Sequence, residues 1–311
     1  MNISERIIKC EAGPEAEGVR LDLFLSGRFT YNSRSRWQEA VSDGLILVNG
    51  SRCRSSRLMR AGDVVAFTPE FDEPEVDPSF NIIYRDEHIL IVDKSGNLPC
   101  HPAGAYFKNT LWHLLRTSYG NVSIVNRLDR ETSGLTIAAF SSEAAKRFSA
   151  LFDSGEIIKK YTALVFGKFE NEVDAEGFLV QDLSSEVRKK RRFMRTVAAG
   201  TAGAEYCRTF LRPMKTDGKI SLVEAVPFTG RLHQIRATLF SLGFPLLGDK
   251  LYGPDDGIYL RFINDSMTDK DRALLMLKRQ ALHAKYLEFI HPFSGEKCIF
   301  ESSFPSDLIL S

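Results

Sequence analysis

The chain has 311 residues and a formal net charge of +1, and its apolar share of 43% and charged share of 26% are ordinary for a globular protein. The length predicts two domains, while so small a net charge indicates no partner by itself. No charged start precedes an apolar run, and no apolar stretch approaches the roughly 18 to 20 residues of a membrane helix, so neither a secretory signal nor a membrane span is expected.

The first part of the chain is rich in arginine. Eight arginines lie between positions 20 and 60, against three acids. Apolar spacing and turn residues predict two short helices and then two strands, over 19–25, 35–41, 45–50 and 63–67. Arginines interleaved with aromatic residues are typical of a surface that binds a polyanion, so we expect Arg34 and Arg36 to contact nucleic acid. The competing interpretation is a solvated basic surface.

An acidic, proline-rich segment comes next. Residues 69–78 contain three prolines and five acids. Prolines lack a backbone donor and like charges repel, so this segment predicts an extended linker. We therefore expect a small module over 1–68, a linker over 69–79 and a larger domain over 80–311.

The larger part alternates predicted strands and helices. Strands are expected over 89–92, 122–125, 135–140, 161–166, 206–212 and 220–227. Helices are expected over 111–117, from an N-cap at Ser141 to a stop at Gly155, and over 231–242. In the last of these, His233 and Arg236 fall outside the apolar stripe. The pattern predicts an α+β domain whose mixed, mostly antiparallel sheet is flanked by helices.

A second basic run lies at 188–192. We expect Lys189, Lys190 and Arg191 to contact nucleic acid backbone. Either basic stretch alone is explained equally well by a solvated surface. Two such stretches in a chain balanced elsewhere by acids favour a nucleic acid partner.

The segment 126–140 places Asp129 between Arg127 and Arg130 in a predicted turn between two strands. Turns on a rigid scaffold often present functional side chains. A neighbouring arginine can keep such a carboxylate ionised, and an ionised aspartate can act as a nucleophile or as a base. From the residues alone, a structural Arg–Asp pair in an ordered loop is the commoner explanation.

Other chemistries find less support. Glu131 beside Asp129 suggests a glycosidase with two carboxylates, but the second acid has no motif of its own. The six histidines have no metal-binding spacing, and the five scattered cysteines form neither a disulfide framework nor a metal knuckle, so no metal is expected and a reducing cytoplasm fits.

Six ordered motifs resemble the RluA-type RNA pseudouridine synthases. "RLDRETSGL" begins at 127, "KKYTALVFG" at 159, "TGRLHQIR" at 229 and "LLGDKLYG" at 246. The segments 82–102 and 279–296 resemble flanking parts of the same family, so that the likeness covers nearly all of residues 80–305. Residues 18–67 resemble the small RNA-binding module of the fourth small-subunit ribosomal protein.

The resemblance implies a pseudouridine synthase fold and an isomerase that detaches uracil from ribose, turns it and rejoins it through a ring carbon without metal or cofactor. Asp129 then matches the family's essential aspartate, and Tyr161 matches the tyrosine that packs against the target base. Arg231 matches the arginine that pairs with the aspartate. Arg127 matches the arginine that fills the gap left by the flipped uridine, and Leu128 would line the pocket. His233 and Gln234 belong to the motif and are expected to be structural.

Several positions depart from the family pattern. Asn126 replaces a usual histidine, Leu232 a small hydroxyl residue and Thr238 a common histidine. These departures bear on the choice of substrate, expected to be ribosomal or transfer RNA. Two alternatives stay open, a non-catalytic RNA-binding or ribosome-assembly protein and, with less support, a sugar hydrolase. Family likeness favours a monomer.

Overall fold

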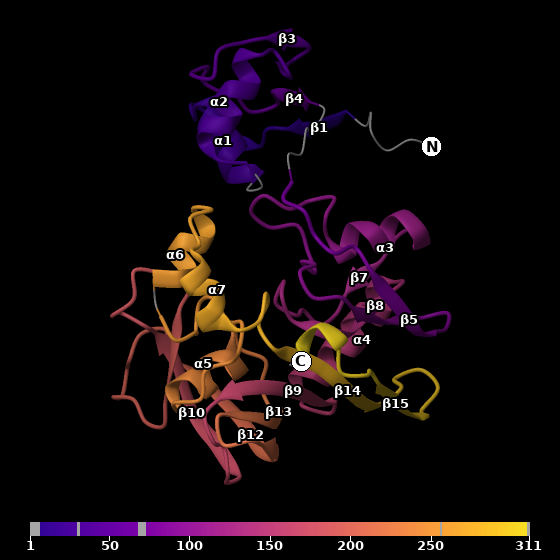
Figure 1. The fold of residues 1–311 in the computed structure, drawn as a ribbon. Coiled ribbons are helices and arrows are strands. Elements are labelled where there is room, and N and C mark those ends of the chain that lie inside the picture. Colours follow the sequence, from indigo (N-terminus) through magenta and orange to yellow (C-terminus); the bar gives the residue numbers. More distant parts are fainter. Residues whose placement is uncertain (1–6, 30–31, 68–72, 256, 310–311) are drawn as a thin grey trace. The chain divides into compact units, whose positions relative to one another are not determined.

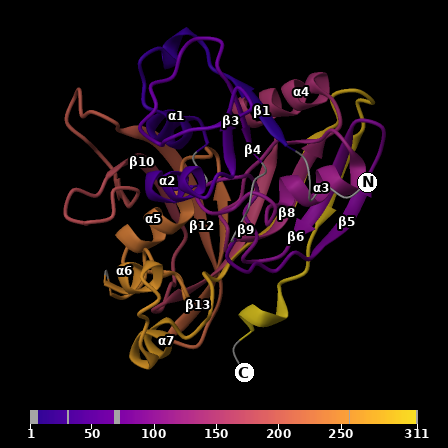
Figure 2. The same cartoon turned by 90° about the horizontal axis from the view of Figure 1, so that it is seen from above.

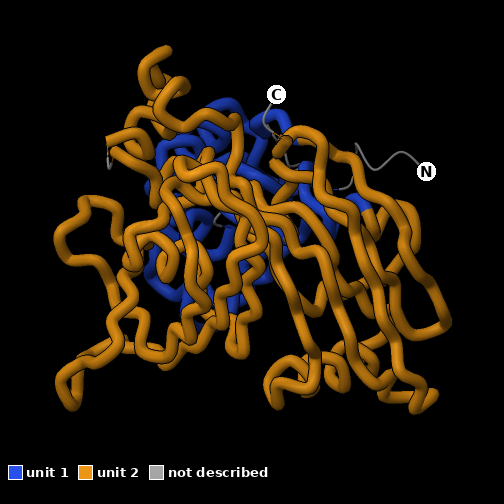
Figure 3. The backbone as a smooth tube through the Cα atoms, turned by 60° about the horizontal axis from the view of Figure 1, so that its bottom comes forward, with its two compact units in different colours: residues 1–76, 101–114 blue, residues 77–100, 115–311 orange. Residues whose placement is uncertain are grey.

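The computed structural model describes residues 7–29, 32–67, 73–255 and 257–309 (Figure 1). The chain divides into two compact units, and Figure 3 colours them separately. Unit 1 comprises residues 1–76 and 101–114, and unit 2 comprises residues 77–100 and 115–311. No helix in the described ranges has both the length and the apolar character needed to cross a membrane.

The described residues of unit 1 up to Phe67 form two α-helices and a small antiparallel sheet. The helices are α1 (Leu21–Arg28) and α2 (Arg34–Ser42), close to their predicted positions. The strands pair in the order β1-β4-β2-β3, with bounds β1 Ile8–Glu11, β2 Ile46–Val48, β3 Ser51–Arg52 and β4 Val64–Phe67. The sequence pattern predicts β2 and β4 but not β1 and β3, with which they pair.

The two helices of unit 1 share one hydrophobic core and are joined by one buried acid. Trp37 is 2% exposed and packs edge-on against Phe67, with ring centroids 5.2 Å apart. Asp22 is fully buried and accepts hydrogen bonds from Arg20, Arg34 and Gln38. These donors hold the pKa of Asp22 far below its usual range. Arg34 therefore ties α2 to α1.

The predicted linker lies partly outside the described residues, at 69–72. From Glu73 onward its acids make specific contacts. The carboxylate of Glu73 accepts the backbone N–H groups of Phe107, Lys108 and Asn109, at 2.7 to 2.9 Å. These residues directly precede α3 (Leu111–Tyr119), so Glu73 orders the approach to that helix.

Unit 2 is built on an eleven-stranded sheet. The main strand order is β11-β10-β12-β13-β9-β14-β8-β6-β5, with β15 beside β14 and β7 beside β8. The strands are β5 Phe80–Arg85, β6 Ile89–Lys94, β7 Ser123–Ile124, β8 Ser133–Ala139, β9 Ile158–Phe166, β10 Val173–Gln181, β11 Arg191–Met194, β12 Glu205–Thr216, β13 Ile220–Pro227, β14 Leu282–Ile290 and β15 Lys297–Glu301. Among the described pairs only β8 and β14 run parallel. The predicted mixed, mostly antiparallel sheet is confirmed.

Helices cover the sheet of unit 2. Helix α4 (Ser142–Asp153) begins at the predicted cap, where Ser141 accepts the N–H of Ala144. Its Phe148 is buried edge-on against Phe289 of β14. Figure 2 shows α5 (Gln234–Ser241), α6 (Gly257–Ile263) and α7 (Asp269–Leu275) on the side of β10, β12 and β13.

Gly134 permits the parallel contact between β8 and β14. Its φ is +114°, and a Cβ there would collide with the carbonyl oxygen of Ala284. A glycine is therefore required where β8 begins. This contact sets the position of the turn that precedes β8, which contains Asp129.

Helix α5 differs from its prediction. It begins at Gln234 rather than Arg231, because His233 adopts a left-handed conformation with φ 56° and starts the helix as its N-cap. Residues 234–239 are all buried, so the helix is covered on every side. The expectation that Arg236 lies outside the buried part is wrong, since Arg236 is 8% exposed.

Candidate active site

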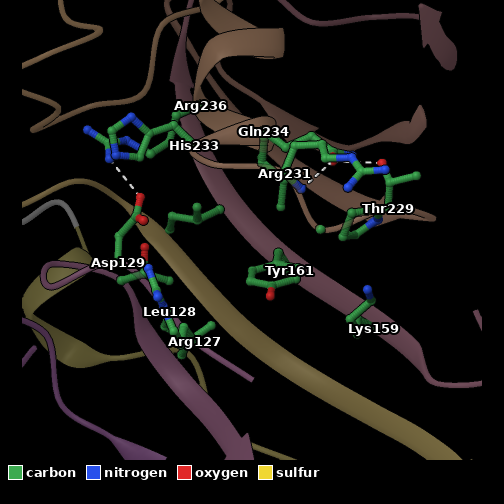
Figure 4. Close-up of a pocket in the computed structure, with 15 residues that line it drawn as sticks. Arg127, Leu128, Asp129, Lys159, Tyr161, Thr229, Arg231, His233, Gln234 and Arg236 are labelled. Atoms are coloured by element: carbon green, nitrogen blue, oxygen red, sulfur yellow. Dashed lines mark hydrogen bonds and ion pairs between the residues drawn. The ribbon is translucent and has the colours of Figure 1, made fainter. Parts of the chain in front are cut away.

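A pocket in unit 2 gathers side chains from five separate segments. They come from the turn before β8, from β9, from the connection between β13 and α5, from α5 itself and from β14 (Figure 4). The lining includes the five residues that the resemblance singled out: Arg127, Leu128, Asp129, Tyr161 and Arg231. The fold therefore brings these five residues, which lie up to about a hundred positions apart, into one pocket, while the role of each stays a prediction.

Arg236 joins two carboxylates at the base of this site. Its Nη1 donates to Oδ2 of Asp129 at 2.6 Å, and its Nε and Nη2 donate to the two oxygens of Asp249 at 2.7 and 2.9 Å. Asp249 is fully buried and also accepts the backbone N–H groups of Leu251 and Tyr252. Asp249 thus anchors the guanidinium, which presents its remaining edge to Asp129.

The expectation that Arg231 pairs with Asp129 is wrong. The Nε of Arg231 donates to the carbonyl of Tyr206 at 3.1 Å, and its backbone N–H donates to Oε1 of Gln234. Because α5 begins three residues later than predicted, it is Arg236, one turn further on, that faces the aspartate. Arg231 stays at the pocket as an exposed lining residue.

Asp129 is held in its ionised form. Burial would raise the pKa of the carboxyl, but the neighbouring guanidinium of Arg236 and the hydrogen bonds from Arg236 and Gln280 outweigh burial and lower the pKa below its usual value. The side chain keeps 27% of its surface exposed toward the pocket. An ionised carboxylate with an open face can act as a nucleophile or as a base.

Buried polar groups support the turn that contains Asp129. Gln280 donates to Thr132 at 2.6 Å and lies 3.5 Å from Asp129. Glu131 accepts two contacts from Lys250, at 2.8 and 3.0 Å. Since its carboxylate is buried and paired, Glu131 is not presented to the pocket as the second acid of a glycosidase.

The other pocket residues differ in burial. Tyr161 projects from β9, and its burial raises the pKa of the phenol, so the hydroxyl stays protonated at neutral pH. Leu128 is buried, and its backbone exchanges hydrogen bonds with the thiol of Cys100. Arg127 is exposed at the rim, and no ion pair joins it to a residue that the structure describes.

Asn126 has a structural explanation. Its Oδ1 accepts the backbone N–H of Ile137 at 2.7 Å, and its Nδ2 donates to the carbonyl of Leu135 at 3.4 Å. Strand β7 ends at Ile124, so the amide continues the pairing to β8 with a side chain in place of backbone. Asn126 thereby holds the start of the turn that contains Asp129 against the sheet.

The basic residues around 188–192 are placed unequally. Lys189 is exposed, and Arg191 begins β11 with partial exposure. Lys190 is 1% exposed and directs its amine toward the ring of Phe240, at 4.6 Å. The hairpin between β10 and β11 turns this side chain toward α5, so the expectation that Lys190 contacts RNA is wrong for this conformation.

Comparisons with known proteins identify the family. A profile described as RNA pseudouridylate synthase matches residues 88–241, and an S4 domain profile matches residues 19–65. The chain is 30% identical to the ribosomal large subunit pseudouridine synthase D of Pseudomonas aeruginosa, over 95% of this chain and 91% of that protein. The chain belongs to the RNA pseudouridylate synthase family. The predicted resemblance is confirmed, as is the RNA-binding type of the N-terminal module.

Two further likenesses agree with this assignment. This RNA pseudouridylate synthase is 30% identical to the mitochondrial tRNA pseudouridine(32) synthase of Saccharomyces cerevisiae, over 76% of the chain and 50% of that protein. The human RNA pseudouridylate synthase domain containing 1 shares the fold, with a TM-score of 0.57, 24% identity and coverage of 76% of this chain and 89% of that chain. The enzyme is therefore an isomerase that acts on RNA.

Sequence reasoning missed the residues that support the synthase's aspartate. Arg236, Asp249, Lys250 and Gln280 all lie inside the motifs that were quoted, but no local pattern says which of them contact Asp129. One signal in the sequence pointed to two of them: the motif "LLGDKLYG" contains an acid and a base, Asp249 and Lys250, to which no partner was assigned. In the described ranges, no group of histidines, cysteines or acids is arranged to hold a metal ion.

Proposed function

We propose that this synthase isomerises specific uridines of large-subunit ribosomal RNA to pseudouridine, with Asp129 as the catalytic aspartate. The RNA class follows the name of the Pseudomonas aeruginosa relative, which the chain matches over almost its whole length. Transfer RNA is the second candidate, favoured by the name of the yeast relative.

One observation carries the catalytic assignment: Asp129 is kept ionised by Arg236 in a pocket that Tyr161 also lines. The carboxylate attacks the ribose or removes a proton from it, and either step needs an anion with an open face. Tyr161 stays neutral, and its ring provides a stacking surface for a base. Stacking suits a base that must rotate, because it does not depend on which uracil edge points inward.

Base flipping explains the remaining pocket residues. A uridine inside a stack cannot reach Asp129, so it must leave the stack at a cost of a few kcal/mol. Arg127 is exposed at the rim, where its guanidinium can fill the vacated space and contact phosphate. Leu128 then forms the apolar wall beside the flipped nucleotide.

The decisive test maps pseudouridines in total RNA from three kinds of cell: cells that lack the protein, cells with Asp129→Asn and cells with Asp153→Asn. Asp153 is an exposed carboxylate at the end of α4, so its replacement makes the same chemical change away from the pocket. We expect one or more sites to disappear in the first two strains and to persist in the third.

The outcomes separate the alternatives. If every pseudouridine persists without the protein, the enzyme proposal fails and a non-catalytic RNA-binding role takes its place. If sites disappear without the protein but persist with Asp129→Asn, the catalytic role of Asp129 fails. The identity of the affected RNA decides between ribosomal and transfer RNA.

A further inference from the structure

His233 occupies an unusual position at the pocket. It lines the cavity and is only partly buried, and its backbone adopts the left-handed conformation with φ 56°. Residues other than glycine seldom adopt this conformation, and asparagine tolerates it better than most. Histidine, like asparagine, is enriched in this conformation, so the backbone does not distinguish the two residues and the contacts of the ring must. The next residue, Gln234, has a purely structural task, since its amide binds Thr229, Arg231, Arg208 and Thr209.

A hydrogen-bond chain determines which nitrogen of His233 carries the proton. The backbone N–H of Arg191 donates to the hydroxyl oxygen of Tyr252 at 2.9 Å. That hydroxyl lies 3.1 Å from Nδ1 of His233. Tyr252 is fully buried, so its hydroxyl hydrogen needs an acceptor, and Nδ1 is the acceptor within reach among the described residues. Nδ1 therefore accepts, and the proton of the imidazole resides on Nε2.

The electrostatic surroundings keep the imidazole neutral. Burial and the neighbouring cation Arg236 lower the pKa of His233 to about 4, although Asp129 and Asp249 oppose the shift. Burial raises the pKa of Tyr252, so its hydroxyl keeps the hydrogen that it donates. At neutral pH His233 is then an uncharged ring with Nε2–H as its free donor. No residue in the described part of the chain accepts a hydrogen bond from Nε2.

We infer that His233 donates a hydrogen bond from Nε2 to a carbonyl oxygen of the target uracil, with Tyr252 as the residue that positions it. The inference rests on the proposed function. When the bond between the ribose carbon and the uracil nitrogen breaks, its electron pair goes to the uracil ring and spreads onto the carbonyl oxygens. A fixed donor stabilises that charge most in the transition state. His233 keeps its proton throughout.

A matched pair of substitutions separates this role from a structural one. In His233→Gln the side-chain amide nitrogen lies near the former Nε2, so a donor remains in the pocket. In His233→Asn the amide lies near the former Nδ1, so the contact with Tyr252 and the left-handed backbone are retained but the pocket donor is lost. The measurement is the single-turnover rate of pseudouridine formation at saturating RNA, with thermal unfolding recorded for each variant.

We expect His233→Asn to fold well and to be slower than wild type by about tenfold to a hundredfold, and His233→Gln to be at least about tenfold faster than His233→Asn. A structural role predicts the reverse order. Equal rates for the two variants, or a faster asparagine variant, overturn the inference. Wild-type activity is the reference, so loss of the proposed function is recognised separately, by the absence of any wild-type product.

The role of Tyr252 is tested by a double-mutant cycle. Tyr252→Phe removes the hydroxyl that fixes the tautomer, so we expect a slower rate in the wild-type background. In the His233→Asn background the same change should alter the rate by less than about twofold, because the donor it positions is already gone. Equal effects in both backgrounds would mean that Tyr252 acts only through general stability.

Discussion

Arg236 binds two acids that differ in exposure. Asp249 is fully buried, whereas 27% of the Asp129 side chain is exposed. The guanidinium uses two donors on Asp249 and one on Asp129. The buried acid therefore fixes the cation, and the cation sets the charge of Asp129. A buried charge of this kind is costly unless each of its partners is present.

At this scale we predict the pH response of Arg236→Gln. The pKa of Asp129 is depressed in the wild type, so its ionised form persists from neutral into weakly acidic pH and is lost only as the pH falls through that lowered pKa. Without the cation the burial penalty remains, and the pKa of Asp129 should rise. We expect the single-turnover rate to fall about a hundredfold at neutral pH. In the pH–rate profile, the acid limb, where the rate is lost as the pH falls, should move to higher pH.

Arg236→Lys is the matched control, because it keeps the positive charge but cannot bind both carboxylates in the same way. Its acid limb should lie between those of the wild type and of Arg236→Gln. An acid limb at the wild-type position in Arg236→Gln would refute the link between this guanidinium and Asp129.

At the scale of elements, a side chain extends the short strand β7: it pairs with a backbone group of β8 that β7 does not reach. β7 has two residues, and the amide of Asn126 takes over its pairing with β8. β6 occupies one edge of β8, and Gly134 allows β14 to pair at the start of the same edge that β7 pairs further along. The turn that contains Asp129 is thus fixed by sheet contacts before it, at Asn126, and after it, at Gly134.

We predict that Asn126→Ala lowers the free energy of unfolding by about 1–3 kcal/mol, because the buried N–H of Ile137 loses its acceptor. Asn126→His should lose less, since a neutral imidazole presents Nδ1 as an acceptor near the former Oδ1. Denaturant unfolding of the three proteins measures this order. An alanine variant as stable as wild type would show that Asn126 does not hold the turn.

At the scale of the whole molecule, the net charge is only +1, but the arginines of unit 1 fall into two classes. The arginines of the first class form ion pairs with acids of the same unit. Arg20 and Arg34 pair with Asp22, Arg36 pairs with Glu39, and Arg57 pairs with Asp63. A second class is exposed and forms no ion pair with any described residue: Arg28, Arg52, Arg54 and Arg60. The second class is better suited to bind phosphate, because its charge is not already compensated.

We therefore predict that RNA affinity falls with salt and that Arg52→Ala with Arg54→Ala flattens this dependence. The slope of log affinity against log salt should decrease in magnitude by roughly 1.5, at about 0.7 to 0.9 for each phosphate contact. The rate at saturating RNA should not change. Binding titrations at several salt concentrations provide the measurement.

The control removes the same charge from unit 2, by Lys215→Ala with Lys270→Ala, two exposed lysines that form no ion pair with a described residue. If it changes the slope as much as the pair in unit 1, the effect reflects net charge rather than a contact. A slope that no variant alters would contradict RNA binding by the exposed arginines of unit 1.

Local sequence determined much of this protein. The cap at Ser141, the strands around Asp129 and the two helices of unit 1 follow from patterns within a few residues, because capping and periodic burial are local effects. The ordered motifs were sufficient for the family. They also selected Asp129 and Tyr161, because a motif reports which residues are present, whereas the pocket that both residues line is a feature of the fold.

The tertiary structure decided which residues pair with one another. Arg236 rather than Arg231 reaches Asp129, since His233 delays the start of α5. Lys190 is buried because its hairpin turns toward α5, and the proton of His233 is placed by Tyr252. Each outcome depends on a contact between segments distant in the chain. The partner of a long side chain is chosen by which atoms the fold brings within hydrogen-bond distance, and spacing along the sequence does not contain that information.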